Sequence, residues 1–400
     1  MNDDILRGYK EKYRRELEEC LEFWLTHSID RKNGGVYNFL DRQGNVYATD
    51  KSVWIQGRCA WMFSYSSMLY GEKELWRTTA KHCLDFLDNH CIDPADGRMY
   101  FIVTEDGRPV RKRRYYFSET FYIMACAEYG AAFNDPAYTQ KARKYFDLAL
   151  QLYDGKDPYY VTPKFIEANR KLRAFAPPMI LLNIAHVMLR CDSQYAEKYR
   201  AAAARFSDDI IRYFYKEDLK ALLETVGPDG EFLRDIMGGR TVNPGHAVEG
   251  AWFLLMQAQD TGDKALLEKV QNIFDWSMEI GWDKEYGGLY SFVDVLGHPH
   301  DALEHDMKLW WPMSEAMLCA ILLYEETGDE KYFRWFETMD AYFFEKFKDA
   351  KEWLGYLRRD GTPTLPACKG NLFKGPFHIP RMFAMAEQCL SRLEAAKKGL

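Results

Sequence analysis

The fold is decided by the stretch His246-Ala-Val-Glu-Gly-Ala-Trp-Phe-Leu-Leu-Met-Gln-Ala-Gln259, which has helical spacing and almost no charge. A helix that is apolar nearly all round is buried on every side, because no face of it suits water. A second stretch of the same kind is Ser314-Glu-Ala-Met-Leu-Cys-Ala-Ile-Leu-Leu-Tyr-Glu-Glu326. The chain is therefore expected to enclose some of its helices within a layer of others.

Apolar residues recur at intervals of three and four, the spacing of an α-helix, along most of the chain. This pattern predicts helices over 5–27, 52–70, 73–90, 117–133, 136–152, 178–191, 193–214, 244–260, 263–280, 310–327, 329–347 and 377–396. Charged, amphipathic helices such as 73–90 alternate with charge-poor ones, and each charged helix forms a unit with the charge-poor helix that follows it. Six such helical hairpins predict an all-α fold, an (α/α)6 barrel. No linker rich in Pro, Gly or Ser divides the chain, so we expect one catalytic domain over 1–400.

Short glycine-containing segments between the helices repeat as well. Asp30-Arg-Lys-Asn-Gly-Gly-Val-Tyr-Asn-Phe-Leu-Asp41 resembles Asp283-Lys-Glu-Tyr-Gly-Gly-Leu-Tyr-Ser-Phe-Val-Asp294, with looser relatives at 96–107, 219–230 and 353–361. Each combines two turns around a short apolar run, which predicts a small β-hairpin. The inner helices begin near 52, 117, 178, 244, 310 and 377, at steps of 65, 61, 66, 66 and 67 residues. In such a barrel the inner helices run the same way, so their N-termini and the hairpins gather at one mouth.

The bulk composition excludes several classes of protein. The net charge is −7 and no basic stripe is present, which argues against nucleic acid as a partner. No apolar stretch approaches the ~18 residues needed to span a membrane, and the charged N-terminal sequence has no apolar signal core. The nine cysteines are odd in number and form no C-x-x-C, which is typical of a reducing compartment and predicts a cytoplasmic protein.

Unusual polar and aromatic residues occupy the first turns of the inner helices. They are Trp54, Arg58, Glu119, Tyr122, Met179, His246, Glu249, Trp310, Glu315, His378 and Arg381. A lone histidine on an apolar helix is more often a hydrogen-bonded core residue than a catalyst. Here, however, polar and aromatic residues recur at the same position of successive repeats, which favours a shared site. Six helix N-termini also point partial positive charge at this mouth, which favours a developing anion. Flat aromatic faces suit a sugar ring, although aromatic residues more commonly fill a core.

Other interpretations of these residues are weaker. His246 and Glu249 lack the HExxH pattern of a zinc site, so no metal is predicted. The group His298, His300, His305 and Asp306 is interpreted as a solvated loop. Neither G-x-G-x-x-G nor a P-loop occurs, so a nucleotide as chemical cofactor has no sequence support. A glycoside hydrolase would need two carboxylates flanking the bond, whereas this mouth is richer in His and Arg. A non-catalytic sugar-binding protein is the remaining alternative.

Several of these segments resemble the N-acylglucosamine 2-epimerase family, also known as the renin-binding protein family. NPGHAVEGAWFLL, MKLWWPMSEAM and FKGPFHIPRMFAM carry the resemblance, and KSVWIQGRCAWMFS and FSETFYIMACAEY agree with it. It extends from about residue 30 to 390, in register with the repeat. The resemblance implies an (α/α)6 barrel isomerase that interconverts N-acetylglucosamine and N-acetylmannosamine. It further implies no cofactor for the chemistry, ATP or another nucleotide as an activator, and a homodimer.

The resemblance also assigns roles to individual residues. His246 and His378 match the two acid/base positions, with the polar shell Arg58, Glu249, Glu315 and Arg381 around them. The substrate is expected to meet Trp54, Glu119, Tyr122, Lys164, Met179 and Trp310.

Two features bear on which sugar is bound. Related cellobiose 2-epimerases and mannose isomerases carry a His at the start of the third inner helix, where this chain has Pro178-Met-Ile-Leu-Leu182, as in the N-acylglucosamine branch. Members of the family often have Trp-Trp-Pro-His where this chain has Met313. An epimerase or isomerase of unmodified sugars or disaccharides therefore stays the alternative.

The chemistry suits these residues. Epimerisation at C2 requires the open-chain sugar, removal of the C2 proton next to the C1 carbonyl, and return of a proton to the opposite face. Histidine, with a pKa of ~6.5, acts as base or acid near neutrality. Arg58 and Arg381 would stabilise the O1 anion, each such donor typically contributing ~3 kcal/mol in the transition state. Glu249 and Glu315 would orient the imidazoles, which gives a metal-independent, two-base mechanism.

Overall fold

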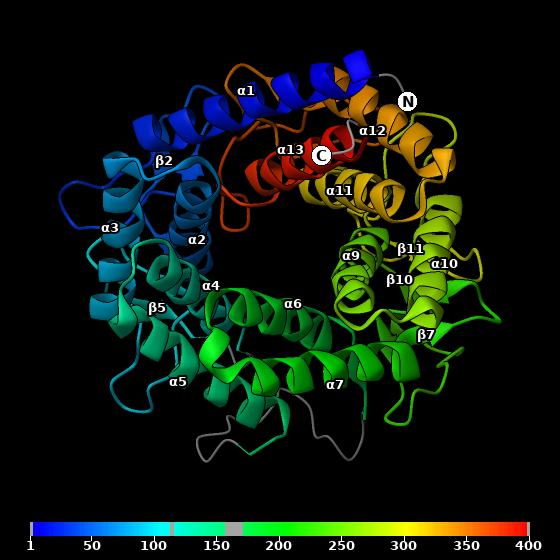
Figure 1. Ribbon diagram of the computed structural model, residues 1–400, viewed down its shortest axis with the longest axis horizontal. Coiled ribbons are helices and arrows are strands. Elements are labelled where there is room, and N and C mark those ends of the chain that lie inside the picture. The colour runs from blue at the N-terminus through cyan, green and yellow to red at the C-terminus, as the bar shows by residue number, and fades with distance from the viewer. Residues whose placement is uncertain (1–2, 113–115, 157–170, 398–400) are drawn as a thin grey trace.

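The computed structural model describes residues 3–112, 116–156 and 171–397, in which the helices form two concentric rings (Figure 1). The inner ring consists of α2 (Val53–Tyr70), α4 (Phe117–Ala132), α6 (Ala176–Cys191), α9 (Pro244–Thr261), α11 (Trp310–Thr327) and α13 (His378–Lys397). The outer ring consists of α1 (Asp3–His27), α3 (Glu74–His90), α5 (Pro136–Tyr153), α7 (Ala196–Phe214), α10 (Lys264–Gly281) and α12 (Glu330–Lys346). A 3-10 helix, η2 (Ser193–Tyr195), and the short α8 (Met237–Arg240) complete the described helices. The predicted (α/α)6 barrel is confirmed.

Each inner helix except α13, which is the last, is joined to the following outer helix by a short connection, and the one between α6 and α7 contains η2. Gly262 and Gly328 end α9 and α11 in the left-handed conformation, with φ of 68° and 69°, which glycine adopts without a steric cost. Asp263 and Asp329 then cap α10 and α12 by accepting hydrogen bonds from backbone N–H groups of the first turn. Such turns fold the two helices back on each other as an antiparallel pair.

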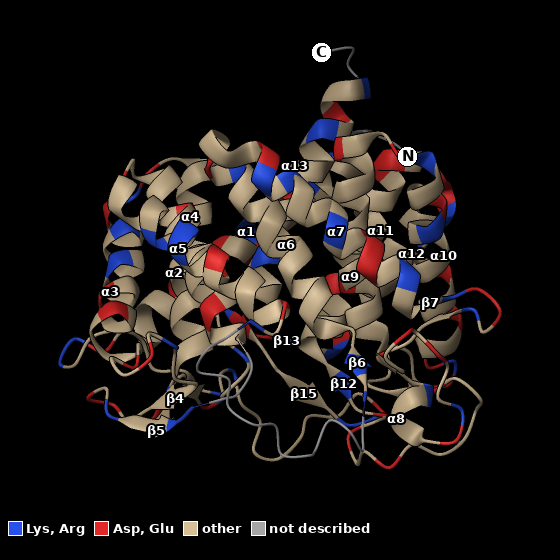
Figure 2. Cartoon of the chain, turned by 90° about the horizontal axis from the view of Figure 1, so that it is seen from below, with Lys and Arg blue, Asp and Glu red and all other residues tan. Residues whose placement is uncertain are grey.

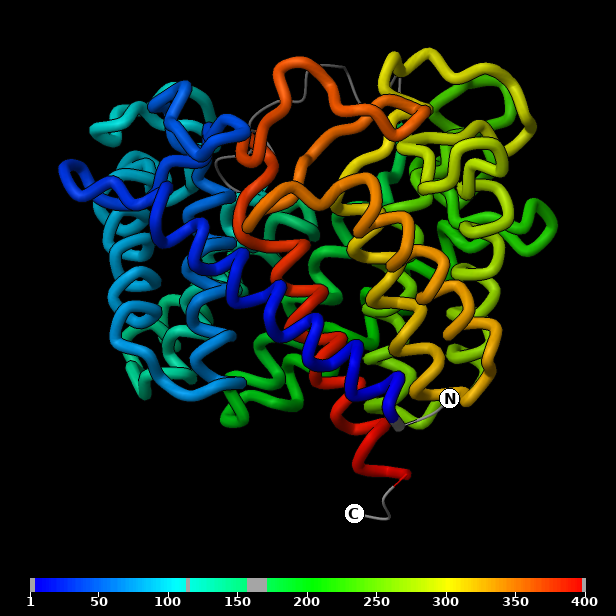
Figure 3. Tube along the Cα trace, turned by 90° about the horizontal axis from the view of Figure 1, so that it is seen from above, coloured from blue at the N-terminus to red at the C-terminus, as the bar shows by residue number. Residues whose placement is uncertain are grey.

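The predicted division into units is wrong in one respect. Outer helices pack mainly against the inner helix that precedes them, as α3 does on α2 and α12 on α11, rather than against the one that follows. The reason is the length of the connections, because the inner-to-outer turns are short and the outer-to-inner segments are long. The first outer helix, α1, consequently packs against the last inner helix, α13, and the ends of the chain close the ring (Figure 3).

The long connections carry short strands at one end of the barrel (Figure 2). The strands are β1 (Phe39–Leu40), β2 (Val46–Ala48), β3 (Lys51–Ser52), β4 (Ile102–Val103), β5 (Pro109–Arg111), β6 (Arg173–Ala174), β7 (Tyr215–Lys216), β8 (Ala221–Leu222), β9 (Thr225–Val226), β10 (Thr241–Val242), β11 (Val293–Asp294), β12 (Lys308–Leu309), β13 (Lys348–Asp349), β14 (Glu352–Trp353) and β15 (Tyr356–Leu357). All described pairs are antiparallel.

The hairpin expectation holds only in part. Hairpins are formed by β1 and β2, β4 and β5, β7 and β8, and β13 and β14. By contrast, β9, β11 and β15 pair with β6, β10 and β12, the strands that directly precede α6, α9 and α11. In the segment 283–294 the turn is closed by the single bridge between Trp282 and Leu289, which leaves β11 free to pair elsewhere. The strands therefore clamp the two ends of a helical pair together and fix where each inner helix begins.

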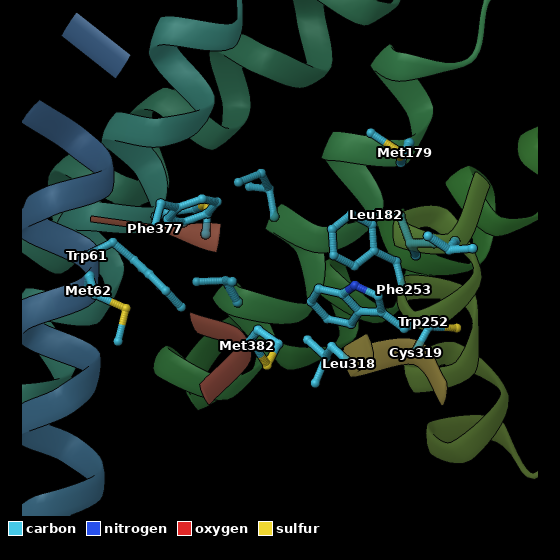
Figure 4. Close-up of a cluster of buried hydrophobic side chains, with 14 of the residues drawn as sticks. Trp61, Met62, Met179, Leu182, Trp252, Phe253, Leu318, Cys319, Phe377 and Met382 are labelled. Atoms are coloured by element: carbon cyan, nitrogen blue, oxygen red, sulfur yellow. The ribbon is translucent and has the colours of Figure 1, made fainter. Parts of the chain in front are cut away.

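The interior of the inner ring is filled by large apolar side chains (Figure 4). Trp61 and Met62 come from α2, Leu182 from α6 and Trp252 from α9, and all are buried. Because these residues come from helices far apart in the sequence, the core forms only when the ring closes. No helix within the described ranges is long and apolar enough to cross a membrane.

Candidate active site

A cavity of about 570 Å³ is present among the first turns of the inner helices, and every inner helix contributes to its wall. The lining includes Trp54, Arg58, Phe117, Phe121, Met179, Asn183, His246, Glu249, Phe253, Trp310, Trp311, His378 and Arg381. Loop residues such as Phe292, Tyr356 and Phe373 complete it. The cavity is therefore largely aromatic, with its ionisable groups gathered on a few helices.

His246 lies in the first turn of α9, whose N-terminus is capped by Asn243. The Asn243 Oδ1 accepts a hydrogen bond from the His246 backbone N–H at 3.1 Å. The imidazole Nδ1 contacts both carboxylate oxygens of Glu224, at 3.0 and 3.1 Å, which leaves Nε2 for a ligand. Desolvation would lower the pKa of His246, but Glu224, with a smaller contribution from Glu249, outweighs it and raises the pKa above its ordinary value.

His378, the first residue of α13, is held by a buried carboxylate. Its Nδ1 lies 2.6 Å from Glu315 Oε1, and the other oxygen of Glu315 accepts a hydrogen bond from the Trp252 indole N–H at 2.9 Å. The Arg381 guanidinium donates to Glu315 and to Glu249, each at 2.7 Å. Burial, together with the nearby cations Arg58 and Arg381, lowers the pKa of His378 well below its usual range.

The two histidines thus have oppositely shifted pKa values within one cavity. The ring of Trp311 lies next to both, with centroid distances of 5.1 Å to His246 and 6.0 Å to His378. Pairs of titratable groups whose environments push their pKa values apart are typical of an acid and a base that act together. One imidazole of the cavity therefore favours its neutral form and the other its protonated form.

Arg58 of α2 adds a cation beside His378. Its guanidinium donates to the Phe373 carbonyl at 3.0 Å and lies 4.2 Å from the centre of the Phe121 ring and 4.9 Å from that of Phe377. Burial lowers the pKa of Arg58 to about 9, against the opposing effect of Glu249. A poorly hydrated cation of this kind interacts strongly with a negative charge that develops nearby.

Glu249, Glu315 and His378 bring potential metal ligand atoms within 4.8 Å of one another. The Arg381 guanidinium, however, already donates to both carboxylates. A cation bound there would have to displace this buried arginine, so the donor set does not suit a metal ion.

Not all of the other predicted site residues line the cavity. Trp54, Met179 and Trp310 line the cavity, whereas Glu315 acts on it only through His378 and Arg381. Lys164 lies outside the described residues.

Two of the predicted substrate contacts are wrong. Glu119 does not line the cavity, and its carboxylate accepts hydrogen bonds from Arg98 and from the Met99 N–H, at 2.7 and 2.9 Å. Tyr122 faces the outer ring, where its hydroxyl donates to Asp88 and its ring packs edge-on against Tyr145. The neighbouring Phe121 lines the cavity instead, because one residue along a helix turns the side chain by about 100°.

Comparison with known proteins places this site in a family. The family model of N-acylglucosamine 2-epimerase (GlcNAc 2-epimerase) matches residues 34–374. The chain belongs to the N-acylglucosamine 2-epimerase family. It is 37% identical to the N-acylglucosamine 2-epimerase of Bos taurus over 98% of this chain and 93% of that protein. A more distant relative is the cellobiose 2-epimerase of Ruminococcus albus, 25% identical over 92% of this chain and 96% of that protein.

A solved structure of the same fold is the cellobiose 2-epimerase from Bacillus thermoamylovorans B4167. Its TM-score is 0.82 at 20% identity, covering 96% of this chain and 99% of that one. Within this fold, Met313 is fully buried and does not line the cavity. Its effect on a bound sugar can only be transmitted through neighbouring residues.

Sequence reasoning missed most of the aromatic lining of this site, including Trp311, and the polar residues Glu224 and Asn183. Glu224 lies in the loop segment 219–230, whose repeat signal is weak, and nothing in the sequence links it to His246. Trp311 stands beside the predicted Trp310, and the doubled tryptophan was a usable signal. Asn183 is a polar residue within the apolar run of α6. A polar residue in such a run is an exception to the pattern and could have been recognised as a candidate.

Proposed function

We propose that this protein interconverts N-acetylglucosamine and N-acetylmannosamine by proton transfer at C2 of the open-chain sugar. The observation that carries the proposal is the pair His246 and His378, which line one cavity and have pKa values shifted in opposite directions. Membership of the family and the greater similarity to mammalian N-acylglucosamine 2-epimerases than to cellobiose 2-epimerases support the choice of sugar.

The base is assigned to His378, whose pKa is lowered, and the acid to His246, whose pKa is raised. The C2–H bond breaks and the proton passes to Nε2 of His378. The electron pair of that bond forms the C1–C2 double bond of an enolate, while the π pair of the carbonyl moves onto O1. Nε2 of His246 then delivers a proton to the opposite face of C2, and the C1 carbonyl forms again. The reverse reaction uses the same two groups with their roles exchanged.

The surrounding residues support this transfer. Arg58 stabilises O1 of the enolate, and Glu315 and Arg381 hold the imidazole of His378 in position. Glu249 keeps Arg381 oriented through its hydrogen bond. Trp54, Met179 and Trp310 contact the sugar from the cavity wall, and Lys164 is proposed as a further sugar contact.

Turnover in deuterated water tests the reaction. N-acetylmannosamine, mannose and cellobiose are incubated in parallel with the enzyme, and the products are separated and analysed by NMR. We expect N-acetylglucosamine from the first sugar, with solvent deuterium at C2. Product without label at C2 would contradict proton transfer, and faster conversion of mannose or cellobiose would favour an enzyme of unmodified sugars.

Three further properties belong to the same proposal. A nucleotide such as ATP activates the enzyme without taking part in the reaction, which an assay with and without ATP tests. The protein is a homodimer, which light scattering tests. It works in the cytoplasm, an assignment supported by its nine free cysteines, seven of them buried.

A further inference from the structure

The wall of the cavity that α6 provides differs from the rest. α6 contributes Ala176, Met179, Ile180 and Asn183 to it, none of which carries a charge. α13, with His378 and Arg381, lies across the inner ring from α6 (Figure 1). The cavity thus has an ionic side that suits the reacting carbons and a neutral side that suits another part of the substrate.

Asn183 is the polar group of this neutral side. Its side chain is 5% exposed, and its Nδ2 makes one contact, with the thioether sulfur of Met124 at 4.0 Å. A thioether is a weak acceptor, and no described residue donates a hydrogen bond to Asn183 Oδ1. Because this amide lines the cavity and has only one weak contact, a polar group of a ligand there can complete its hydrogen bonds.

Apolar side chains line the cavity together with Asn183. Met179 lies one helical turn before it on α6, and Phe253 lines the cavity from α9, the next inner helix (Figure 4). α9 also carries His246, so this wall adjoins one of the two groups that act at C2. A substituent attached to C2 can therefore reach the neutral side while C2 stays near the imidazole.

We infer that Asn183, with Met179 and Phe253 beside it, binds the N-acyl group of the substrate and selects it over a hydroxyl at C2. The acyl carbonyl accepts a hydrogen bond from Asn183 Nδ2–H, and the acyl methyl group packs against Met179 and Phe253. A hydroxyl at C2 has neither the carbonyl nor the methyl group, so it would leave the amide and the apolar surface without a partner. This inference rests on the proposed function and specifies how the cavity distinguishes N-acyl sugars from unmodified ones.

Inhibition by open-chain alditols tests the inference, because these compounds lack the C1 carbonyl and bind without reacting. The probes are N-acetylmannosaminitol and mannitol, and the variants are Asn183→Leu, which keeps the volume, and Asn183→Asp, which cannot donate. We expect both variants to weaken inhibition by the N-acetyl alditol about 10- to 100-fold, as for loss of a buried polar partner. Inhibition by mannitol should change less than 3-fold. Asn272→Leu, on the outer helix α10, is the matched control and should resemble the wild type.

The outcomes separate this inference from the proposed function. Equal weakening of both alditols, or no weakening of either, in a variant with wild-type thermal stability would overturn the role of Asn183. If Asn183→Leu does not fold, Asn183→Asp decides by the same comparison. If the wild-type enzyme converts N-acetylmannosamine and the variants keep the wild-type ratio of inhibition by the two alditols, only the inference fails. If the wild type does not convert that sugar, the proposed function fails first.

Discussion

At the scale of single residues, Glu224 controls the charge of His246. Its carboxylate contacts Nδ1 of that histidine, and the pKa of His246 is raised despite desolvation. Activity that needs protonated His246 is lost as the pH rises through this raised pKa. Glu224→Gln removes the charge and lowers the pKa, so the alkaline limb of the pH profile of kcat should move to lower pH. We also expect kcat to fall about 10-fold or more, as for other groups that orient a functional histidine.

A matched variant distinguishes this effect from general damage to the loop. Glu231→Gln changes an exposed carboxylate in the same connection and should leave the pH profile unchanged. An unshifted alkaline limb in Glu224→Gln would mean that His246 is not the group that titrates there.

The two histidines can be tested one at a time. His246→Asn and His378→Asn should each lower kcat for epimerisation by about 10²–10⁴-fold, the usual contribution of an acid or base. Each variant retains one imidazole and should still exchange the C2 proton of one epimer with solvent deuterium, without inversion. The epimer that exchanges should differ between the variants, as measured by NMR. Near wild-type epimerisation by either variant would end the two-base assignment.

Which of these residues could be predicted depended on the repeat. His246 and His378 both lie in the first turn of an inner helix, at equivalent positions of two repeats. Their location at the same mouth of the barrel therefore followed from the spacing of the inner helices alone. Glu224 could not be predicted because it reaches His246 from a loop whose path depends on strand pairing. Tyr122 was assigned to the cavity because helical phase was judged to within one residue, which is too coarse to distinguish it from Phe121.

At the scale of elements, buried ion pairs fix the loops to the inner helices. Lys51 and Lys308 lie just before α2 and α11, and their ammonium groups contact Asp30 and Asp283 at 2.6 and 3.0 Å. Both aspartates also accept hydrogen bonds from backbone N–H groups of their glycine-containing turns. The repeated Asp-x-x-x-Gly-Gly sequence thus orders a turn and places a buried charge for the lysine.

Lys51→Met should destabilise the protein by about 3–5 kcal/mol, because it leaves a buried carboxylate without its cation. Burial would raise the pKa of Asp30, but Lys51 and the turn N–H groups hold it at about 2. A pKa below the ordinary value stabilises the fold at neutral pH, and this contribution is lost as the pH falls toward 2. The variant should therefore lose less stability on acidification than the wild type. Urea unfolding at several pH values measures both effects.

The control for this variant is Lys32→Met, which removes an exposed lysine from the same turn. It should change the free energy of unfolding by less than about 0.5 kcal/mol. Equal unfolding of Lys51→Met and the wild type would show that the ion pair contributes nothing net to the fold.

The helices could be predicted from the sequence within a few residues, because their apolar spacing is local and extends over several turns. The strands could not, since two-residue strands have too little alternation to reveal a partner. β11 and β15 pair across the mouth with β10 and β12, contacts that depend on the closed ring.

At the scale of the whole molecule, the ring closes between the two ends of the chain. α1 packs along α13, and its Tyr13 hydroxyl donates to Asp340 of α12 at 2.8 Å. α13 carries His378 and Arg381, and α1 supports α13. This part of the cavity wall therefore depends on α1, although α1 itself does not line the cavity. The first and last helices are therefore expected to fold and unfold together.

Leu21→Ala tests this dependence, because Leu21 of α1 is 1% exposed and belongs to the common core. We expect the variant to lose about 2–5 kcal/mol of stability, the usual cost of such a truncation. Activity and helical circular dichroism should disappear in one urea transition, shifted to lower concentration, since separating α1 opens the ring at α13. Ile5→Ala, at a position 42% exposed on the same helix, should shift the transition little. An intermediate that has lost the hydrogen-exchange protection of α1 but keeps full activity would show that the barrel closes without its first helix.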